Sequence, residues 1–573
     1  MLHSAIRVTR DKVVASRGVV AAGHQLEAEA GVRMLEQGGN AVDAAVAAAF
    51  AAAVVEPNNS GLGGNGFMGI HVAQSGHTGV IDWAPRVPSG VGEDLYELEE
   101  GRGNFYEFPR VKNRANRLGY QAAELPGTTV SLCQAHERYG VLDLKTVLQP
   151  AIALAAEGIP VSWRLALVTA ANLADLRRFP ATAKIYLSDG LPLREGNFYA
   201  PGDRLVQKDM ARTLERIAAE GYQVMYKGDI GDAMAAHMAE NGGIWTREEL
   251  ASYGPLIGDP FNERRYSYRG YAYITCGNTV LPEALNILEC FDLGALGRDD
   301  VTYWHLIIEA MRRAWTDNLH YMGDPRREGV PAEGLVSKAY AQRMAERIDP
   351  HRASQDVQPG DPWPFQNQKP RPGSSAIRGA AVGSGVPEHT TNVVAIDRDG
   401  NMVTMLTSLA TSFGSMVTIP GTGILLGNGM LAYNPIPGTL NSLQPGRQPF
   451  KNPTSVLLFK DGAPFATLAA AGGRRITGAS LHIMVNLIDL GMGIQDAIDA
   501  IRLHGERGPV YVDARMPDKL VAALRSLGHD VVLVEENASM SNFARPVGAL
   551  IDLHTKKLHA GGDSLRSTGV AGL

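Results

Sequence analysis

The sequence predicts an α+β fold, in which helices and strands fill different parts of the chain. Between residues 119 and 350, segments such as LKTVLQPAIALAAEG and VTYWHLIIEAMRRAWTDNLH carry apolar residues three or four positions apart, the spacing that buries one face of a helix. After residue 389 the pattern changes to short runs such as NVVAID and MVTMLTS, which are typical of strands. We therefore expect a helix-rich first part and a strand-rich second part.

Residues 41–57 form the longest apolar run, AVDAAVAAAFAAAVVEP. The run contains Asp43 and is shorter than the roughly 20 residues that cross a bilayer, so we expect a buried helix with Asn40 as its N-cap. The glycine-rich segment 58–72 follows this helix and opens a strand, the reverse of a dinucleotide-binding fingerprint. We expect its glycines to permit close backbone contacts and not to bind a nucleotide.

One helical segment raises the question of a metal site. His305, Glu309 and His320 share a predicted helix, on which i, i+4 spacing can pair metal ligands. No HExxH or other ligand pattern accompanies them, so we predict neither a metal nor another cofactor. After this helical region, residues 356–389 are rich in proline, glycine and serine, a composition that predicts a mobile surface segment.

A hairpin is predicted immediately after that segment. Asp399 and Gly400 separate two alternating runs, and this dipeptide favours the tight turns that join antiparallel strands. With a two-residue loop, Thr390 lies opposite Leu409 and beside Ser408, and a bulge would shift this pairing by one residue. The pattern therefore places two hydroxyl groups close together.

Thr390, at the start of this strand, has two interpretations. The first is an ordinary β-branched strand residue, which spacing alone favours. The second is an N-terminal nucleophile, made by cleavage of the bond between His389 and Thr390. Such a threonine carries its own general base, because an α-amine has a pKa of roughly 7.7 to 8.0. The same hydroxyl could cut the chain by attacking the preceding carbonyl.

The composition excludes several classes of partner. The chain has 573 residues, 45% of them hydrophobic, and its net charge of -6 provides no basic surface for nucleic acids or anionic membranes. Three cysteines without a CxxC motif indicate neither a disulfide framework nor a zinc ribbon. The N-terminal residues lack the apolar core of a signal peptide, so we expect a cytoplasmic protein that acts on a small molecule.

Separate motifs, in the same order as in one known family, occur along the chain. They are VVASRGVVAAGHQLEAEAGVRMLEQGGNAVDAAVAAAFAAAVVEPNNSGLGGNGFM, HLIIEAMRRAWTDNLHYMGDP, TTNVVAIDRDGN and AAAGGRRI. Together they resemble the γ-glutamyltransferase family, from about residue 13 to the C-terminal GGDSLRS. The resemblance implies an N-terminal-nucleophile hydrolase with a four-layer αββα sandwich. Its precursor would be cut into intertwined large and small subunits, residues 1–389 and 390–573, and the family resemblance allows a dimer of this unit.

The resemblance also implies roles for single residues. Thr390 matches the family's nucleophile, and Ser408 matches a second hydroxyl residue that bonds to it. Gly472 and Gly473 match the paired glycines whose N–H groups form an oxyanion hole, where each donor contributes around 3 kcal/mol to transition-state stabilisation. This chemistry requires no metal or organic cofactor.

The family's contacts to a glutamyl group are altered. The arginine of a DFRE-like motif becomes Ala84, an asparagine becomes Ala410, and the aspartate of an MDDF motif becomes Ala432. The family's serine pair falls at about Pro449 and Phe450. Because sites that bind through hydrogen bonds discriminate strongly, these losses predict a different acyl group.

The altered positions and their neighbours form the predicted substrate pocket, namely Arg86, Ala410, Ala432, Tyr433, Phe450 and Lys451. Arg86, Arg447 and Lys451 keep positive charge there, which suits a substrate carboxylate, although each of these cations alone slightly favours a solvated surface charge. Phe450, Tyr433 and Ala410 make the pocket more apolar.

The sequence therefore predicts an autoprocessing amidohydrolase or acyltransferase that forms an acyl-Thr390 ester with a non-glutamyl acyl group. Alternatives stay open. One is a family member that cleaves a carbon–carbon bond next to a carbonyl in small-molecule biosynthesis. Another is an unprocessed, non-catalytic binding protein, and a third is an ordinary γ-glutamyl transferase or glutathione hydrolase.

Overall fold

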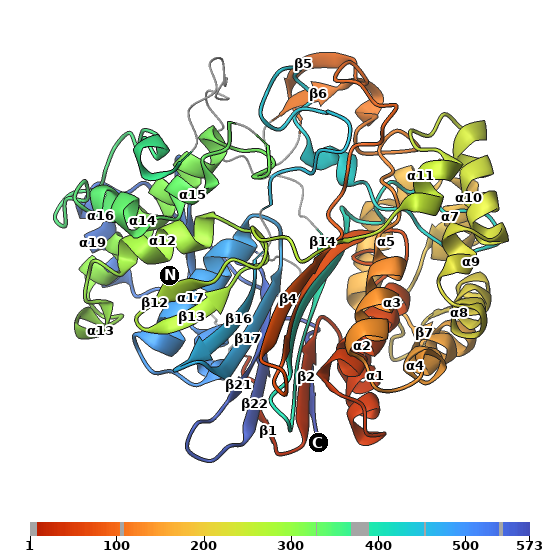
Figure 1. Ribbon diagram of the computed structural model, residues 1–573, viewed down its shortest axis with the longest axis horizontal. Coiled ribbons are helices and arrows are strands. Elements are labelled where there is room, and N and C mark those ends of the chain that lie inside the picture. The colour runs from red at the N-terminus through yellow and green to blue at the C-terminus, as the bar shows by residue number, and fades with distance from the viewer. Residues whose placement is uncertain (1–7, 104–107, 328, 368–388, 452–453, 538–541) are drawn as a thin grey trace.

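Two seven-stranded antiparallel sheets form the centre of the computed structural model, which describes residues 8–103, 108–327, 329–367, 389–451, 454–537 and 542–573 (Figure 1). Sheet I has the order β1 (Val13–Ala15), β22 (Leu558–Gly562), β21 (Arg545–Ile551), β17 (Ala463–Ala471), β16 (Ser455–Lys460), β13 (Tyr271–Ile274) and β12 (Tyr266–Tyr268). Sheet II has the order β11 (Leu256–Ile257), β4 (His77–Asp82), β3 (Asn65–Val72), β15 (Met402–Ala410), β14 (His389–Asp397), β2 (Gly18–Ala22) and β23 (Gly569–Gly572). Both sheets thus combine strands from the two ends of the chain.

Helices cover the outer face of each sheet (Figure 1). Over sheet II lie α1 (Gln25–Glu36), α2 (Ala41–Val55), α3 (Thr128–Tyr139), α4 (Leu144–Glu157), α8 (Lys208–Glu220), α9 (Gln223–Tyr226), α10 (Asp229–Glu240) and α11 (Arg247–Ser252). Over sheet I lie α12 (Val280–Leu288), α13 (Leu293–Leu296), α14 (Val301–His320), α16 (Lys338–Ala345), α17 (Arg475–Ile488), α18 (Ile494–Asp499) and α19 (Asp518–Ser526).

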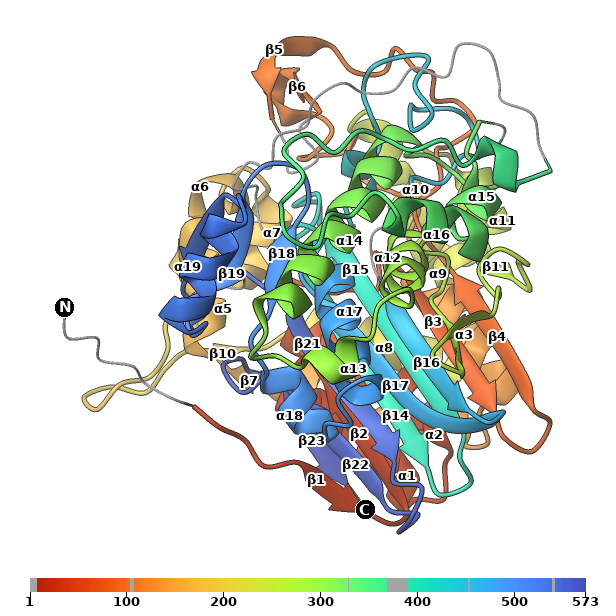
Figure 2. The ribbon, with the colours of Figure 1, turned by 90° about the vertical axis from the view of Figure 1, so that its left-hand side faces the viewer.

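Smaller elements complete the described part of the chain. The helices are α5 (Trp163–Ala171), α6 (Leu173–Leu176), α7 (Pro180–Tyr186), α15 (Ala332–Leu335) and the 3-10 turns η1 (Lys112–Arg114), η2 (Trp363–Phe365) and η3 (Gly429–Ala432). The strands are β5 (Leu98–Arg102), β6 (Pro109–Val111), β7 (Ile159–Pro160), β8 (Leu187–Ser188), β9 (Leu191–Pro192), β10 (Arg204–Leu205), β18 (Leu503–Gly505), β19 (Val510–Asp513) and β20 (Val531–Val534). Figure 2 shows β5 and β6 beyond one end of the two sheets.

Apolar side chains fill the space between successive layers. Val394 of β14 lies in the core between the two sheets, whereas its neighbour Val393 faces the helices over sheet II, because successive strand residues point to opposite faces. Leu458 of β16 and Trp315 of α14 belong to the core on the other side, between sheet I and its helices. The predicted α+β fold and its four-layer αββα arrangement are confirmed.

The alanine-rich run forms α2 as predicted. Asn40 caps it by accepting hydrogen bonds from the N–H groups of Val42 and Asp43, and the Asp43 carboxylate accepts from the N–H of Asn40 at 2.9 Å. The small side chains allow α1 and α2 to approach closely, since a Cβ atom at Gly31 would lie 2.9 Å from the Ala44 carbonyl oxygen. Among the described helices, none combines the length and the apolar character needed to cross a membrane.

The glycine-rich turn after α2 serves close packing, as predicted. A Cβ atom at Gly63 would lie 2.5 Å from the Leu425 carbonyl oxygen, and one at Gly64 would collide with the carbonyl oxygen of Ser408. The turn therefore runs against the end of β15. No role in nucleotide binding is needed to explain these glycines.

The hairpin β14–β15 forms, but the predicted two-residue loop is wrong. Ile396 pairs with Met402, so the loop spans residues 398–400, with Gly400 at φ +86°. Asp397 favours the longer loop because its carboxylate accepts hydrogen bonds from the N–H groups of Asp399 and Asn401, both at 3.0 Å. As a result Thr390 pairs directly with Ser408 and not with Leu409.

The predicted mobile segment is described only in part. Residues 368–388 lie outside the described residues, so this prediction stays untested there. At its beginning, Gly360 donates a hydrogen bond from its N–H to the Asp317 carboxylate at 2.7 Å and accepts one from the Tyr321 hydroxyl at 3.0 Å. This part of the segment therefore packs along α14.

Candidate active site

Thr390 and Ser408 face each other at the ends of β14 and β15. Their hydroxyl oxygens lie 3.1 Å apart, and the two residues are only 6% and 9% exposed. The Ser408 hydroxyl donates to the carbonyl oxygen of His389 at 2.7 Å and accepts from the N–H of Ala410 at 2.9 Å. Because Ser408 has a single hydroxyl proton, Thr390 must donate to Ser408. Ser408 thus contacts both the Thr390 hydroxyl and the carbonyl oxygen of the preceding residue.

Three side chains hold the peptide bond between His389 and Thr390 from behind, and we call Glu56, Asn59 and Arg545 the peptide clamp. Arg545 donates from Nη2 to the Thr390 carbonyl oxygen at 2.8 Å and from Nη1 to Glu56 at 3.0 Å. Asn59 donates to the same Glu56 oxygen at 2.8 Å, and its own side-chain oxygen lies 3.0 Å from His389 Nδ1. The clamp therefore contacts the residues on both sides of the bond, through the backbone of Thr390 and the side chain of His389.

The clamp is buried, and its charges are nearly balanced. Burial favours a neutral Glu56, but the Arg545 guanidinium overrides this effect and lowers the pKa of Glu56 to about 2. Glu27, which accepts a hydrogen bond from Thr391 at 3.3 Å, has a pKa well above its usual value because of burial and the nearby Glu56 charge. One carboxylate therefore stays ionised against Arg545, while the other keeps its proton.

His389 is neutral in this environment. Burial and the charges of Arg164 and Arg545 lower its pKa to about 3. A neutral imidazole can donate from Nδ1 to the side-chain oxygen of Asn59, which matches the observed contact. The residue on the carbonyl side of the predicted scissile bond is thus held without charge.

Gly472 and Gly473 lie at the junction of β17 and α17, close to this bond. Ala471, the last residue of β17, pairs with Arg545, whose guanidinium reaches Thr390. Gly472 has φ +143°, and a Cβ atom there would lie 2.8 Å from the Cα atom of Ala544, so glycine is required. Within the described residues neither glycine N–H has a hydrogen-bond acceptor. The two donors precede the positive end of α17, a suitable place to bind an oxyanion.

Several residues predicted to line the substrate pocket lie beside the end of β15. We call Arg86, Ala410, Ala432 and Tyr433 the substrate wall. Ala410 adopts φ +71° directly after the paired hydroxyls, and Ala432 ends η3. The buried Tyr433 donates its hydroxyl to the Pro85 and Arg447 carbonyl oxygens at 3.0 and 2.7 Å. Arg86 lies 4.8 Å over the Tyr253 ring and bonds to the Gly254 carbonyl. Phe450 is buried, and its N–H donates to the side-chain oxygen of Asn441, whose amide donates to the Ala432 carbonyl oxygen.

Lys451 and Arg447, two of the cations predicted to bind a substrate carboxylate, form hydrogen bonds with other residues of the protein. Lys451 is buried and donates to the Asp82 carboxylate at 2.6 Å and to the Asn262 oxygen at 2.7 Å. Arg447 donates to the Ser442 carbonyl oxygen at 2.9 Å and to the Ser442 hydroxyl at 3.1 Å. These contacts hold the loop that precedes β16. A role for these cations in substrate binding stays a prediction.

A buried carboxyl group supports the wall from inside. Glu124 accepts a hydrogen bond from the Asn65 amide at 2.7 Å, and Asn65 pairs with Ser408 across β3 and β15. Burial raises the pKa of Glu124 to about 8. Its other oxygen packs against Gly429 at the start of η3, so the protonated side chain links the nucleophile strand to the wall.

Sequence reasoning missed the clamp and Glu124. Glu56 directly follows α2, which is apolar apart from Asp43, and a charge at that position was a sign of a buried ion pair. Arg545 lies 489 positions from Glu56, so no local pattern could join them.

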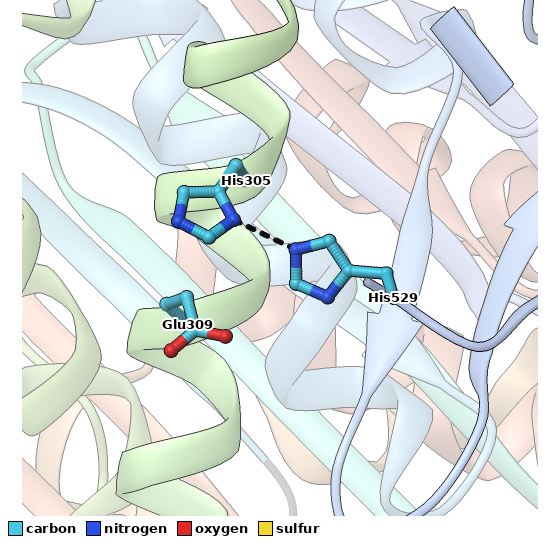
Figure 3. Close-up of side chains that lie close together, drawn as sticks. All are labelled: His305, Glu309 and His529. Atoms are coloured by element: carbon cyan, nitrogen blue, oxygen red, sulfur yellow. Dashed lines mark hydrogen bonds between the residues drawn. The ribbon is translucent and has the colours of Figure 1, made fainter. Parts of the chain in front are cut away.

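A second cluster of titratable side chains lies on the first half of α14 (Figure 3). His305 Nδ1 and His529 Nε2 are 2.7 Å apart, and His305 Nε2 lies 2.8 Å from the Asp349 carbonyl oxygen. Glu309 accepts from Arg313 at 2.5 Å and from the Ser354 hydroxyl at 2.6 Å. The facing atoms already have protein partners, and a guanidinium sits beside the carboxylate. The cluster therefore ties α14 to the segment before β20, and His320 is not part of it.

The family model described as gamma-glutamyltranspeptidase matches residues 28–573. The chain belongs to the γ-glutamyltranspeptidase family. This transpeptidase-family protein is therefore an enzyme, an N-terminal-nucleophile hydrolase or acyltransferase, and its four layers are those of that fold.

Relatives of the transpeptidase-family enzyme carry two kinds of name. It is 35% identical to the acylase ACY 1 proenzyme of Pseudomonas sp. strain SE83, over 90% of this chain and 88% of that protein. It is 33% identical to a glutathione hydrolase proenzyme of Pseudomonas sp. strain A14, over 87% and 83%. Among solved structures, a cephalosporin acylase from Bacillus halodurans is similar with a TM-score of 0.85 and 27% identity, covering 100% of this chain and 98% of the other.

Proposed function

We propose that this enzyme cleaves its own chain between His389 and Thr390 and then hydrolyses or transfers an acyl group through an acyl-Thr390 ester. The observation that carries the proposal is the contact of Ser408 with both the Thr390 hydroxyl, at 3.1 Å, and the His389 carbonyl oxygen, at 2.7 Å. Relatives named as proenzymes support a precursor that is processed into large and small subunits.

Self-cleavage would begin from the hydrogen bonds already described. The Thr390 hydroxyl oxygen bonds to the carbonyl carbon of His389, the carbon–nitrogen bond breaks, and the hydroxyl proton passes to the freed nitrogen. Water then hydrolyses the resulting ester, which leaves a carboxylate on His389 and both an α-amine and a hydroxyl on Thr390. The peptide clamp keeps the two residues in place during these steps.

The same hydroxyl then acts on a substrate amide. The Thr390 α-amine accepts the hydroxyl proton as the oxygen attacks the amide carbon, and the N–H groups of Gly472 and Gly473 stabilise the oxyanion. The proton passes to the leaving amine. Water, or a second amine, then releases the acyl group from the ester and regenerates Thr390.

The acyl group is proposed to differ from γ-glutamyl. Ala84, Ala410 and Ala432 carry no group that could bind an α-carboxylate or an α-ammonium. The relatives named as an acylase and a cephalosporin acylase support this part of the proposal. The cytoplasmic location and a dimer of the two-subunit unit are likewise proposals.

Gel analysis with mass spectrometry tests the cleavage. The purified wild-type chain is expected as fragments 1–389 and 390–573, and Thr390→Ala as one chain. A persistent single wild-type chain would overturn the proposal. For specificity, a panel of acyl p-nitroanilides is compared by kcat/KM. γ-Glutamyl p-nitroanilide is expected to be cleaved at least tenfold less efficiently than the best substrate, and γ-glutamyl as the best acyl group would refute the non-glutamyl assignment.

A further inference from the structure

Exposed apolar side chains gather in one segment of the chain. Within the described residues, six of the thirteen large apolar side chains that are exposed lie between residues 163 and 206, which is less than a tenth of the chain. They are Trp163, Leu167, Leu191, Phe198, Tyr199 and Val206. Single exposed apolar residues are normal on a protein surface, whereas a group of them marks a contact surface.

The most exposed of these side chains lie on the loop between β9 and β10, and we call residues 194–203 of this loop the aromatic finger. Phe198 is 95% exposed and Tyr199 is 91% exposed. Figure 2 shows the finger projecting from the body of the molecule beside α5 and β10. The two rings contact each other edge to face, with centroids 5.3 Å apart, and cover little else of their own chain.

Hydrogen bonds define the shape of the aromatic finger. The Asn197 side-chain oxygen accepts from the N–H groups of Tyr199 and Ala200 at 2.8 and 3.1 Å. At the base, the Asp203 carboxylate accepts from the Arg194 N–H at 2.8 Å, and the Asp203 N–H donates to the Arg194 carbonyl oxygen at 2.9 Å. Aromatic side chains on an ordered loop can bind a partner with a small loss of conformational entropy.

A second group of exposed apolar side chains lies near the base of the finger. Trp163 and Leu167 are one turn apart on α5, so both lie on the same side of this helix. α5 packs beside β9, which carries the exposed Leu191, and we call these three residues the α5 face. The N–H of Val161, two residues before Trp163, donates to the Asp203 carbonyl oxygen at 3.0 Å and joins the start of α5 to the finger.

Residues 194–204, the finger and the residue after it, carry no net charge. Arg194 and Arg204 are balanced by Glu195 and Asp203, and Arg194 lies 3.3 Å from Asp203 in the same copy. Arg204 donates to the Gly158 carbonyl oxygen at 2.6 Å, and Glu195 is exposed, so each of them can meet the oppositely charged group of a second copy. A nucleic acid or an anionic membrane would instead require an excess of cations.

The area that these side chains can bury matches the area of a stable interface. An aromatic side chain buries roughly 150–250 Å², so the four finger rings of two copies would bury roughly 600–1,000 Å². The surface that the rings cover adds a similar area, which gives roughly 1,200–2,000 Å² in total, the size of a specific protein–protein interface.

From these observations we propose that the aromatic finger of one copy docks on the α5 face of a second copy of this chain. The same contact then occurs twice around a two-fold axis, since each copy has both a finger and an α5 face. The inference gives a defined interface to the dimer proposed above, and it does not depend on self-cleavage of the chain.

Sedimentation velocity of the purified protein over a hundredfold range of concentration tests the dimer. The wild type is expected to show an equilibrium between one and two copies. Phe198→Ser combined with Tyr199→Ser should raise the dimer Kd by at least about 100-fold, because aromatic anchors dominate interface energies and each substitution occurs twice. Thr390→Ala should dimerise like the wild type. A wild type that sediments as one copy at every concentration would overturn the inference without affecting the proposed function.

A mixture of two variants tests whether the finger and the α5 face touch each other. Leu167→Asp should also weaken the dimer, because it buries a charge in the apolar contact, but it keeps an intact finger. The double finger variant keeps an intact α5 face. In a mixed dimer both changes fall on one contact and the other contact stays intact, so the mixture should associate more tightly than either variant alone. A mixture that associates no more tightly than the better variant would overturn the inference.

Val532→Ser combined with Leu533→Ser is the matched control, because these two residues are also consecutive, apolar and exposed, but lie on β20. Its dimer Kd should equal that of the wild type, and an equal rise in Kd would contradict the assignment of the finger. Phosphatidylcholine vesicles test the other kind of occupant. A single-copy wild type that co-sediments with these vesicles, and loses this binding in the double finger variant, would assign the finger to a membrane surface and overturn the inference.

Discussion

Arg545 and Glu56 form a buried ion pair of 3.0 Å, directly behind the bond that Thr390 is proposed to cut. The pair joins β21 to the end of α2 and gives one guanidinium hydrogen bond to the Thr390 carbonyl oxygen. Burial and the charge of the nearby Glu56 raise the pKa of Glu27, which bonds to Thr391 beside the pair. The first prediction follows from this relationship.

Arg545→Gln should both destabilise the protein and slow self-cleavage. Removing one partner leaves the Glu56 carboxylate buried without its counter-charge, a change that typically costs about 3–5 kcal/mol. Urea unfolding measures the loss, and a time course of fragment formation measures cleavage. Glu56→Gln combined with Arg545→Gln should recover part of the stability. Arg216→Gln removes exposed ion pairs with Glu220 and Asp229 and should change stability by less than about 1 kcal/mol. Equal losses in the two single arginine variants would contradict the assignment of the clamp.

Ser408→Ala should retard self-cleavage while leaving the fold intact. The variant removes the donor to the His389 carbonyl oxygen and the acceptor for the Thr390 hydroxyl, and loss of one such donor typically costs about 10²–10³-fold in rate. Ser408→Thr preserves the hydroxyl and should cleave at a rate closer to the wild type. Cleavage rates are read from gels after expression and rapid purification. If Ser408→Ala is processed as fast as the wild type, Ser408 has no role in the cleavage.

Gly472→Ala should lower kcat for the best p-nitroanilide by about 100-fold. A Cβ atom at this position would lie 2.8 Å from the Ala544 Cα atom and would displace the N–H groups proposed to bind the oxyanion. Gly491→Ala is a matched control, because Gly491 also has positive φ but has open space around its missing Cβ. It should cost stability without a comparable loss of kcat. If kcat falls equally in the two variants, the effect of Gly472→Ala comes from its backbone conformation and not from the loss of an oxyanion site.

Glu124 predicts a stability that depends on pH. Its pKa of about 8 in the folded protein lies above the usual 4.5, so the folded state binds a proton that the unfolded state releases between these values. The stabilising contribution is therefore complete below about pH 4.5 and is lost as the pH rises through 8. Glu124→Gln, which stays neutral, should lack this loss, with a difference on the order of 3–5 kcal/mol at the upper end.

Urea unfolding of the wild type and Glu124→Gln at pH 5, 6.5, 8 and 9 measures this difference. Parallel stability curves for the two proteins would show that Glu124 keeps its ordinary pKa. Since Glu124 supports η3, the same series also reports whether the substrate wall loosens at alkaline pH.

Local patterns were sufficient to predict much of the fold and the centre of the site. Alternation and the Asp-Gly dipeptide placed Thr390 beside Ser408, because the residues that determine a hairpin are close in sequence. The loop length was wrong because the side chain of Asp397, outside the predicted turn, extends it by one residue. The number of residues in the loop therefore depends on the hydrogen bonds of the Asp397 side chain, which cannot be read from the Asp-Gly dipeptide alone.

The charged partners could not be predicted in this way. Lys451 is positive in the sequence, but only the fold places Asp82 and Asn262 around it. The partners that bind a cation are far away in the sequence, so its charge alone suggested a role for Lys451 in substrate binding and did not reveal these contacts.

The order of strands in sheet II affects how the protein can refold after cleavage. β14 and β15 lie between β3 and β2, and β2 in turn pairs with β23 from the opposite end of the chain. The precursor can assemble this interleaved sheet in a first-order reaction, because all strands belong to one molecule. Once the bond at Thr390 is cut, reassembly after unfolding requires two molecules to meet and becomes second order. The protein would then have a single favourable opportunity to fold, and its persistence would depend on the rate of unfolding more than on equilibrium stability.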